Sequence, residues 1–552
     1  MDRQGPCQRD APPKDSYNYK ELTGEDEIRL LRLAHGEQTF AIEHQRVKDV
    51  PAYEALSYVW GDDSRRNEFY LADGTVLYLN DNLFEALQYL PQRCETEYLW
   101  IDQICIDQSN IKERNHQVKI MGNIYRHAYK VLIWMDADDS VARSLNDLWE
   151  DFRKEAKVTS RARLEEFVDS KRKVYLAEGE SNIRNRLQNQ VWHHPWFSRA
   201  WVFQELALSQ RAVFVFGQTS TMFLTVVWIS RAVYPLTYGT QKFDWHTAAT
   251  MTAMDRMNRH WNHKDQHLLT IHFLSEMCPI YQASDPRDLI YAFMGLFSSK
   301  PSLHEYSSER EIQPNYALSY NSVLADVAAY FVSRGKGNCC IKKATNRCWL
   351  CQYGDRNALD ILAHINRDLP VPSHGNATFR PSPETGLPSW APDWKYSRSS
   401  WCYEANNANL RYGKPIPPRY QYNSFSPEVH PRLDAEHPRQ LHVLGVCIHV
   451  IKQAGITIAN EEWQYWKRWQ VFVGGPYPNA EELGKVEWAG DITWGHSTIP
   501  GDKVCWLSRC SLPVILREVE CGKHIVVETC YLPKTFPDPD KSTLINETFL
   551  LI

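Results

Sequence analysis

Short apolar runs alternate with amphipathic segments between residues 26 and 225, and this alternation limits the fold more than any other feature of the sequence. Each apolar run has the length and composition of a buried strand, and each amphipathic segment repeats its apolar residues at helical spacing. Alternation of this kind is typical of a parallel sheet flanked by helices, so we expect an α/β fold. The predicted strands are 53–60, 98–106, 131–135 and 212–216, and the predicted helices are 80–90, 110–128 and 198–209.

Composition divides the rest of the chain into regions. Residues 1–25 form a polar leader that contains proline but lacks the apolar stretch of a secretory signal. Residues 140–190, inside the alternating domain (26–225), are charged and helix-favouring, so we expect a helical insertion there. Beyond the domain we expect a mainly helical region at 226–375, a loop-rich connector at 376–440 and a small C-terminal β-rich region at 441–552.

Aromatic content and charge exclude several classes of protein. The 552 residues include 20 Trp, 28 Tyr and 20 Phe, whose burial offsets chain entropy, so the chain is not mainly disordered. The net charge of −5 gives no general attraction for nucleic acid, and no apolar run is long enough to span a membrane. Without a secretory signal, the 14 cysteines are expected to be thiols and the protein to be cytoplasmic.

Polar side chains gather where the predicted strands end. Ligands of open parallel sheets bind beyond the carboxyl ends of the strands, so these residues are candidates for a binding site. The alternative is that they cap helices or bond to the backbone. The candidate residues are Ser57, Tyr58, Trp60, Gly61 and Asp62 at the end of the first strand, and Asp102 on the second.

A tryptophan and a glutamate share one face of the predicted helix at 198–209. Trp201 and Glu205 are four residues apart, so both side chains project from the same side. A carboxylate beside an aromatic ring suits a reaction that builds positive charge on a sugar, because the carboxylate stabilises or attacks the cationic carbon. The same spacing also fits a packed ring beside a solvated carboxylate, so spacing alone leaves both interpretations open.

Patterns for cofactors and metals are weak. The sequence has no glycine-rich dinucleotide motif and no phosphate-binding loop, so we expect no bound cofactor, and no metal at the strand ends. Cys339, Cys340, Cys348 and Cys351 lie in a short stretch, and the last two have the spacing of zinc ligands. A matching second pair is absent from the sequence, so a zinc-stabilised scaffold and ordinary thiols both stay open.

Three segments resemble the three blocks of the fungal heterokaryon incompatibility (HET) domain. They are Tyr53–Asp62 (YEALSYVWGD), Leu99–Gln108 (LWIDQICIDQ) and Arg199–Glu205 (RAWVFQE). The resemblance implies a role in fungal non-self recognition and in the programmed cell death that follows fusion of unlike hyphae, with an incompatibility partner protein. Further segments resemble those that accompany the domain in long HET proteins: DPRDLIYAFMG at 285–295, LPSWAPDW at 387–394 and PGDKVC at 500–505.

A more distant resemblance bears on mechanism. The HET core is similar to Toll/interleukin-1 receptor (TIR) domains, which implies a flavodoxin-like sheet and cleavage of the nicotinamide–ribose bond of NAD, the activity of an NAD nucleosidase. Carried over, Glu205 is the catalytic carboxylate, and Trp201 is a ring that contacts the substrate. Ser57, Tyr58, Trp60 and Gly61 then lie at the nucleotide end of the pocket. In this interpretation NAD is the substrate and no cofactor is needed.

The same resemblance supports a function without chemistry. TIR domains also signal purely by assembly, so a non-enzymatic death-signalling adaptor is the alternative to an NAD-cleaving enzyme. Because TIR-like enzymes commonly complete their pockets by assembly, we expect activity to depend on a homo-oligomer or on release of an autoinhibitory contact from residues 226–552.

Overall fold

The computed structural model divides the chain into two compact units, which are described separately. The first contains Met1–Gln266, Tyr291–Ser298 and Pro314–Tyr316, and the second contains the other residues. The division of the chain into five regions stays a prediction. The residues described are 16–34, 39–47, 49–62, 64–155, 161–175, 182–233, 274, 278, 281–295, 312–333, 387–391, 393–396, 432–437, 439–451, 453–458, 469–473, 489–492, 499–508, 514–529 and 546–552.

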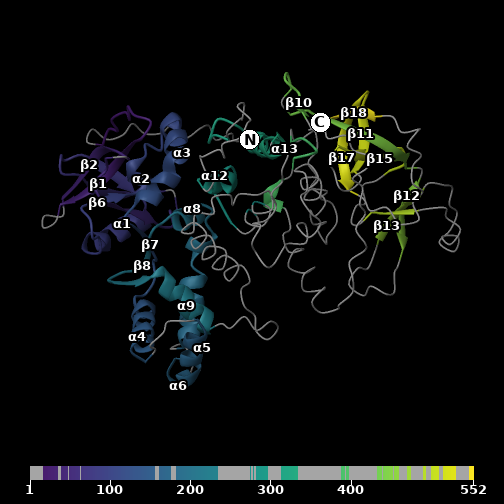
Figure 1. Ribbon diagram of the computed structural model, residues 1–552. Coiled ribbons are helices and arrows are strands. Elements are labelled where there is room, and N and C mark those ends of the chain that lie inside the picture. Colours follow the sequence, from purple (N-terminus) through teal and green to yellow (C-terminus); the bar gives the residue numbers. More distant parts are fainter. Residues whose placement is uncertain are drawn as a thin grey trace, which may run out of the picture. The chain divides into compact units, whose positions relative to one another are not determined.

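The first unit is built on a seven-stranded sheet with the order β2-β1-β6-β3-β7-β8-β9 (Figure 1). The central pairs β6–β3, β3–β7 and β7–β8 are parallel, and the outer pairs β2–β1, β1–β6 and β8–β9 are antiparallel. The predicted α/β class and helix-flanked sheet are confirmed, although the sheet is mixed. Its strands are β1 (Glu27–Ala34), β2 (Thr39–Arg46), β3 (Tyr53–Ser57), β6 (Tyr98–Trp100), β7 (Lys130–Trp134), β8 (Ala212–Phe216) and β9 (Thr219–Met222).

The order of the parallel strands fixes where a ligand would bind. Across the sheet, the four parallel strands stand in the order β6-β3-β7-β8, so the first two of them in the chain exchange places in space. Doubly wound sheets of the flavodoxin type begin with the same order, and their ligands bind where the chain reverses direction across the sheet. That point lies between β3 and β7. The closer likeness to TIR domains stays a prediction.

Helices connect these strands, and capping residues set where several of them begin. The Asn80 side chain accepts a hydrogen bond from the backbone N–H of Leu83 and starts α1, and Asn110 caps α3 in the same way. Fully buried β3, β7 and β8 are what a sheet covered on both faces requires. The elements are α1 (Asp81–Tyr89), η1 (Leu90–Gln92), α2 (Asp102–Cys105), α3 (Ile111–His127), η3 (Pro195–Ser198) and α8 (Trp201–Ala207), with the hairpin β4 (Asn67–Tyr70) and β5 (Val76–Leu79) before α1.

Two predicted strands are too long. The strand predicted at 98–106 ends at Trp100, because Asp102 turns its carboxylate onto the N–H of Gln103 and begins α2. The strand predicted at 53–60 ends at Ser57. Beyond it, the carbonyl oxygens of Tyr58 and Val59 accept side-chain hydrogen bonds, which takes them out of the sheet ladder.

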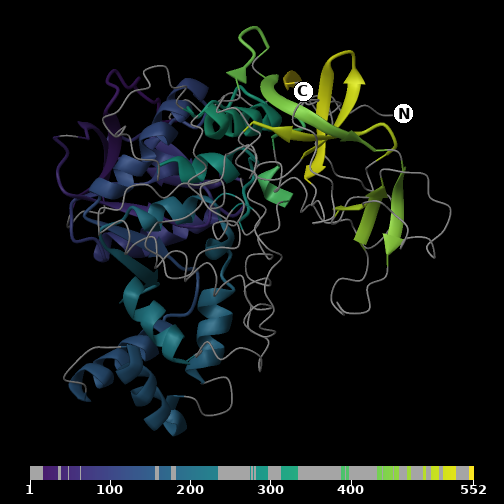
Figure 2. The same ribbon diagram turned by 45° about the vertical axis from the view of Figure 1, so that its right-hand side comes forward.

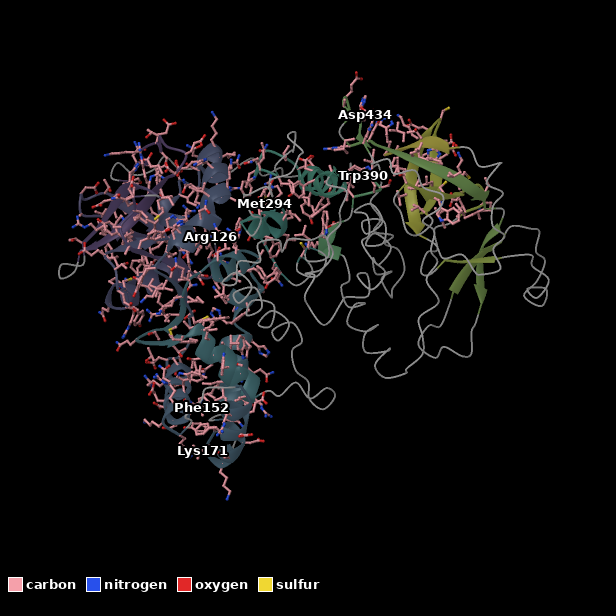
Figure 3. All side chains as sticks on the ribbon, viewed as in Figure 1. Arg126, Phe152, Lys171, Met294, Trp390 and Asp434 are labelled. Carbon is pink, nitrogen blue, oxygen red and sulfur yellow. The ribbon has the colours of Figure 1, made fainter. Side chains whose placement is uncertain are left out.

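The described residues of the predicted insertion at 140–190 are mostly helical and have an apolar interior of their own. Phe152 lies 5.6 Å from the rings of Trp149 and Phe167, and Trp149 meets Trp228 edge to face (Figure 3). Charged residues such as Lys171 occupy the outer face, so the segment is amphipathic. It comprises α4 (Ser140–Glu155), α5 (Arg161–Ser170), α6 (Arg172–Tyr175), α7 (Ile183–Arg186) and η2 (Leu187–Trp192), and α4, α5 and α7 pack on α9 (Phe223–Val233).

The structure confirms that the C-terminal part of the chain is rich in β-strands. β11 pairs with both β15 and β18, which closes the order β11-β15-β16-β17-β18 into a small barrel, drawn in green to yellow in Figure 2. β12, β13 and β14 form a separate three-stranded sheet. The strands are β10 (Arg432–Leu433), β11 (Leu441–Val450), β12 (Gln453–Ile458), β13 (Trp469–Val473), β14 (Ala489–Ile492), β15 (Lys503–Leu507), β16 (Val514–Glu520), β17 (Lys523–Thr529) and β18 (Asn546–Leu551).

The accessory segments at 387–394 and 500–505 contribute buried side chains to the second unit. Trp390 and Trp394 are fully buried, and the Asp393 carboxylate accepts the Tyr320 hydroxyl at 2.9 Å. Asp502 is buried and pairs with Arg517 at 2.8 Å. Within 226–375 and 376–440 the described elements are the rest of α9, α12 (Asp288–Met294), α13 (Tyr320–Ser333), η6 (Trp394–Tyr396) and β10; the other residues of these regions lie outside the described part. No helix in the described ranges has both the length and the hydropathy needed to cross a bilayer.

Candidate active site

The carboxyl end of β3 brings together residues from distant parts of the first unit. Ser57 is the last residue of β3 and pairs with Ile133 of β7, so it stands where the chain reverses across the sheet. Asp102 begins α2, directly after the neighbouring strand β6. α8 follows the insertion and places Glu205 against the end of β3. Glu205 and Asp102, predicted from two separate motifs, therefore belong to one site.

Glu205 is held by a buried hydrogen-bond chain. The Ser57 hydroxyl donates to Oε2 of Glu205, and the indole N–H of Trp196 donates to Oγ of Ser57 at 2.7 Å. The exposed fractions of Glu205 and Ser57 are 1%, and that of Trp196 is 0%. A carboxyl group enclosed in this way has exchanged water for one hydroxyl donor, so its ionisation is costly.

Burial raises the pKa of Glu205 to about 7. The Arg199 guanidinium and the Ser57 hydroxyl act in the opposite direction and lower this pKa, and the Asp102 carboxylate raises it. The carboxyl group is therefore poised between its two protonation states near neutral pH, which is where a catalytic acid or base is most useful.

A second carboxylate lies in the same cluster. Oδ2 of Asp102 accepts the indole N–H of Trp60 at 2.8 Å. Burial raises the pKa of Asp102, and burial together with the Asp102 charge raises the pKa of Tyr58. Arg199 donates to the carbonyl oxygen of Tyr58 and lowers the pKa of Asp102 as well as that of Glu205, so one guanidinium serves two carboxyl groups.

Three predicted residues lie at the margin of this cluster. Gly61 and Asp62 form an exposed turn after β3, in which Gly61 has a φ of 69° and the Asp62 carboxylate accepts the Ser64 hydroxyl at 2.9 Å. The positive φ explains the glycine. Trp201 begins α8 and is half-buried. Their roles in binding stay predictions.

The sequence did not single out several residues that complete the site. Trp196 lies in the short η3 helix before α8, and its link to Ser57 spans 139 positions. Asn82 of α1 donates to the carbonyl of Val59 at 2.5 Å and accepts from Trp134 of β7 at 2.9 Å, which joins two strand ends. Arg199 is the first residue of the RAWVFQE segment, and a positive charge beside apolar residues is the sequence signal that could have marked it as part of the site.

The accessory motif at 285–295 ends against the helix that carries Glu205. Oε1 of Gln204 accepts the backbone N–H of Gly295 at 2.8 Å, and Phe203 meets Phe293 edge to face at 5.4 Å. Arg126 of α3 donates to the Gly295 carbonyl at 3.4 Å, and Figure 3 labels Arg126 and the adjacent Met294. The end of the motif therefore helps to hold α8 in place.

Metal ligation has no candidate within the described residues. No three of their His, Cys, Asp and Glu side chains are arranged to hold a metal ion. The cysteines considered for zinc, Cys339, Cys340, Cys348 and Cys351, lie outside the described part of the chain.

Comparison with known proteins finds a family whose domain matches the region of this site. Residues 53–205 match the family described as heterokaryon incompatibility protein (HET), a stretch that runs from the first residue of β3 to Glu205. The match supports a HET domain there. The chain is also 26% identical over 464 residues to heterokaryon incompatibility protein 6, OR allele, of Neurospora crassa. That alignment covers 75% of this chain and 62% of the Neurospora protein. No solved structure matches the chain.

Proposed function

We propose that this chain is a heterokaryon incompatibility protein that acts in fungal non-self recognition and programmed cell death. Support comes from the HET match over 53–205 and from the similarity to a Neurospora protein with that name. The proposal includes a cytoplasmic location and an incompatibility partner protein that triggers the response.

We further propose that the HET domain cleaves the nicotinamide–ribose bond of NAD in the manner of TIR-like enzymes. The observation that carries this proposal is the position of Glu205: a buried carboxyl group with its pKa raised to about 7, at the carboxyl ends of parallel strands. Such a group is well suited to stabilise charge that develops on a substrate, because its surroundings have a low dielectric constant.

The chemistry requires little of the protein besides this carboxylate. When the bond between ribose C1′ and the pyridinium nitrogen breaks, the electron pair moves to nitrogen, and nicotinamide leaves as a neutral molecule. The ribosyl cation that remains is stabilised, or trapped covalently, by ionised Glu205. Water then adds to C1′ and releases a proton, giving ADP-ribose. Trp201 would contact the substrate, and Ser57, Tyr58, Trp60, Gly61, Asp62 and Asp102 would surround it.

The test is NAD loss and nicotinamide release by the purified full chain, followed by chromatography. Glu205→Ala and Glu205→Gln should remove turnover, since neither has a negative charge to offset the ribosyl cation. Glu97→Gln, the same change at an exposed position, should leave turnover intact. Equal turnover by the wild-type chain and both Glu205 variants would remove this residue from the mechanism.

One observation favours the alternative, a non-enzymatic adaptor that signals by assembly. Glu205 is only 1% exposed and is already hydrogen-bonded, so a substrate reaches it only after the site opens. An adaptor needs no such access. Cell death that persists in a fungal strain with Glu205→Ala, without a fall in cellular NAD, would favour the adaptor over the enzyme.

If the chain is an enzyme, assembly into an oligomer is one way in which the enclosed site would open to NAD. We propose that NAD turnover depends on a homo-oligomer or on release of an autoinhibitory contact from residues 226–552. Turnover per chain should then rise with protein concentration or on binding of a partner, and a monomer that is fully active at all concentrations would contradict this dependence.

A further inference from the structure

We propose that Trp196 and Ser57 form a positioning pair that orients the Glu205 carboxylate and stabilises its ionised form. The inference rests on the proposed function, because it assigns these residues to the site of NAD cleavage. It also changes the role predicted for Ser57, from contact with the nucleotide to support of the catalytic carboxylate. Neither residue of the pair is proposed to touch the reacting atoms.

Donor and acceptor chemistry fixes the direction of the hydrogen bonds. An indole nitrogen has one hydrogen and accepts nothing, so in the 2.7 Å contact Trp196 is the donor and Ser57 Oγ is the acceptor. A serine hydroxyl has a single hydrogen of its own. With Oγ accepting from Trp196, that hydrogen is directed to Oε2 of Glu205. An ionised carboxylate can only accept, so in that state the Ser57 hydroxyl is the donor to Glu205.

Packing holds the donor end of the pair still. The Trp196 ring meets Phe197 edge to face at 4.8 Å and Phe214 of β8 at 5.8 Å, and it is completely buried. Its backbone N–H is bound by Nδ1 of His194, which caps η3 at the N-terminus. Close packing on two sides of a buried ring restricts its rotamers, which favours the orientation in which the indole N–H points at Ser57.

The acceptor end is equally constrained. Ser57 belongs to β3, which is hydrogen-bonded to β6 on one side and β7 on the other, and the register pairs Ser57 with Ile133. β7 and β8 pair in turn, and Phe214 of β8 contacts Trp196. The sheet itself therefore sets the spacing between the indole and the hydroxyl.

Charged and titratable groups from several neighbouring elements lie around Glu205. Arg199, just before α8, favours the ionised form, whereas Asp102 of α2 and burial favour the protonated form. Tyr125 of α3 and Tyr58, which follows β3, belong to the same electrostatic group. Against this balance the Ser57 hydroxyl is a neutral donor that stabilises the charge, so its loss should move Glu205 towards the protonated, inactive form.

Substitutions separate positioning from packing. Ser57→Ala removes the donor, so the pH at which activity rises should move upward by about one unit, with lower turnover at neutral pH. Ser57→Thr keeps a hydroxyl and should restore the profile. Trp196→Phe keeps a ring but frees the serine hydroxyl to rotate, so a smaller upward shift is expected.

Matched controls exist in the same unit. Ser230→Ala removes a buried hydroxyl of α9 that has no hydrogen-bond partner, and Trp192→Phe alters another ring that packs on Phe197, at 4.9 Å. Both controls should leave the pH profile of NAD cleavage unchanged.

The decisive experiment measures the Glu205 carboxyl directly alongside activity. Infrared difference spectra against pH report its protonation, and the signal is assigned by its absence in Glu205→Gln. If the pair positions Glu205, Ser57→Ala raises this titration and Ser57→Thr returns it to the wild-type value. An unchanged titration in a folded Ser57→Ala protein overturns the inference. Absence of NAD turnover in the wild-type chain instead overturns the proposed function, and the infrared titration still tests the pair.

Discussion

Replacing Glu205 by glutamine should make the stability of the first unit less dependent on pH while removing the proposed catalytic group. In the folded chain, burial raises the pKa of this carboxyl from 4.5 to about 7. The folded state therefore holds the proton more tightly than the unfolded state. Its stabilising effect is complete below the unfolded pKa and is lost as the pH rises through the folded pKa.

The magnitude follows from the two pKa values. Each pKa unit corresponds to about 1.4 kcal/mol, and integrating between about pH 5 and pH 8 gives a loss of roughly 2.5 kcal/mol from Glu205 alone. Glutamine does not titrate, so Glu205→Gln avoids this loss. Any constant cost of burying the amide enters at both pH values and cancels in their difference.

Urea unfolding at the two pH values, followed by tryptophan fluorescence, measures the effect. Hydrogen exchange of the peptide that contains α8 confirms that the change is local, since unfolding of two units need not be two-state. The stability of Glu205→Gln relative to wild type should rise by roughly 2.5 kcal/mol from about pH 5 to pH 8. A difference that is the same at both pH values, or the same as that of Glu97→Gln, would refute the raised pKa.

Two further substitutions test the framework around the site. Gly295→Ala would place a Cβ 2.3 Å from Oε1 of Gln204, so we expect a loss of about 1–3 kcal/mol in thermal unfolding and reduced NAD turnover. Gly24→Ala, with 3.4 Å to its nearest neighbour, should be close to neutral by both measures. Glu113→Gln breaks a buried pair with Arg29 at 2.5 Å and should cost about 3–5 kcal/mol in urea unfolding. A loss below 1 kcal/mol for Glu113→Gln would show that Arg29 finds other partners.

The sequence predicted the central strands and helices because each is marked by residues within the element or next to it. The apolar runs at 131–135 and 212–216 correspond to the fully buried strands β7 and β8. Asn80 caps α1, and Asn110 caps α3. Asn110 caps α3 with its side chain, but Glu113 three residues later does not reach back to the Asn110 N–H to complete a capping box. Glu113 turns away to the N–H of Asp107 and to Arg29, because a buried guanidinium needs a charged partner.

The features that could not be predicted from the sequence depend on contacts between residues far apart in the chain. β1 and β2 form an antiparallel hairpin that joins the sheet beside β6, but arginine interrupts the apolar pattern of β1, and Arg29 is buried only because Glu113 of α3 neutralises it. Ser57 and Glu205 are 148 positions apart. Periodicity places Ser57 in a strand and Glu205 in a helix, whereas their hydrogen bond depends on sheet order and on the position of α8.

The most direct test of the account is the rate of nicotinamide release from NAD at about pH 8, compared between the wild-type full chain and Glu205→Gln. At this pH most of the Glu205 carboxyl is ionised, because its pKa is about 7. The account predicts measurable release by the wild-type chain and a rate at least about a hundredfold lower for the variant, as expected when a buried charge-stabilising group is removed. Equal rates for the two proteins would contradict it.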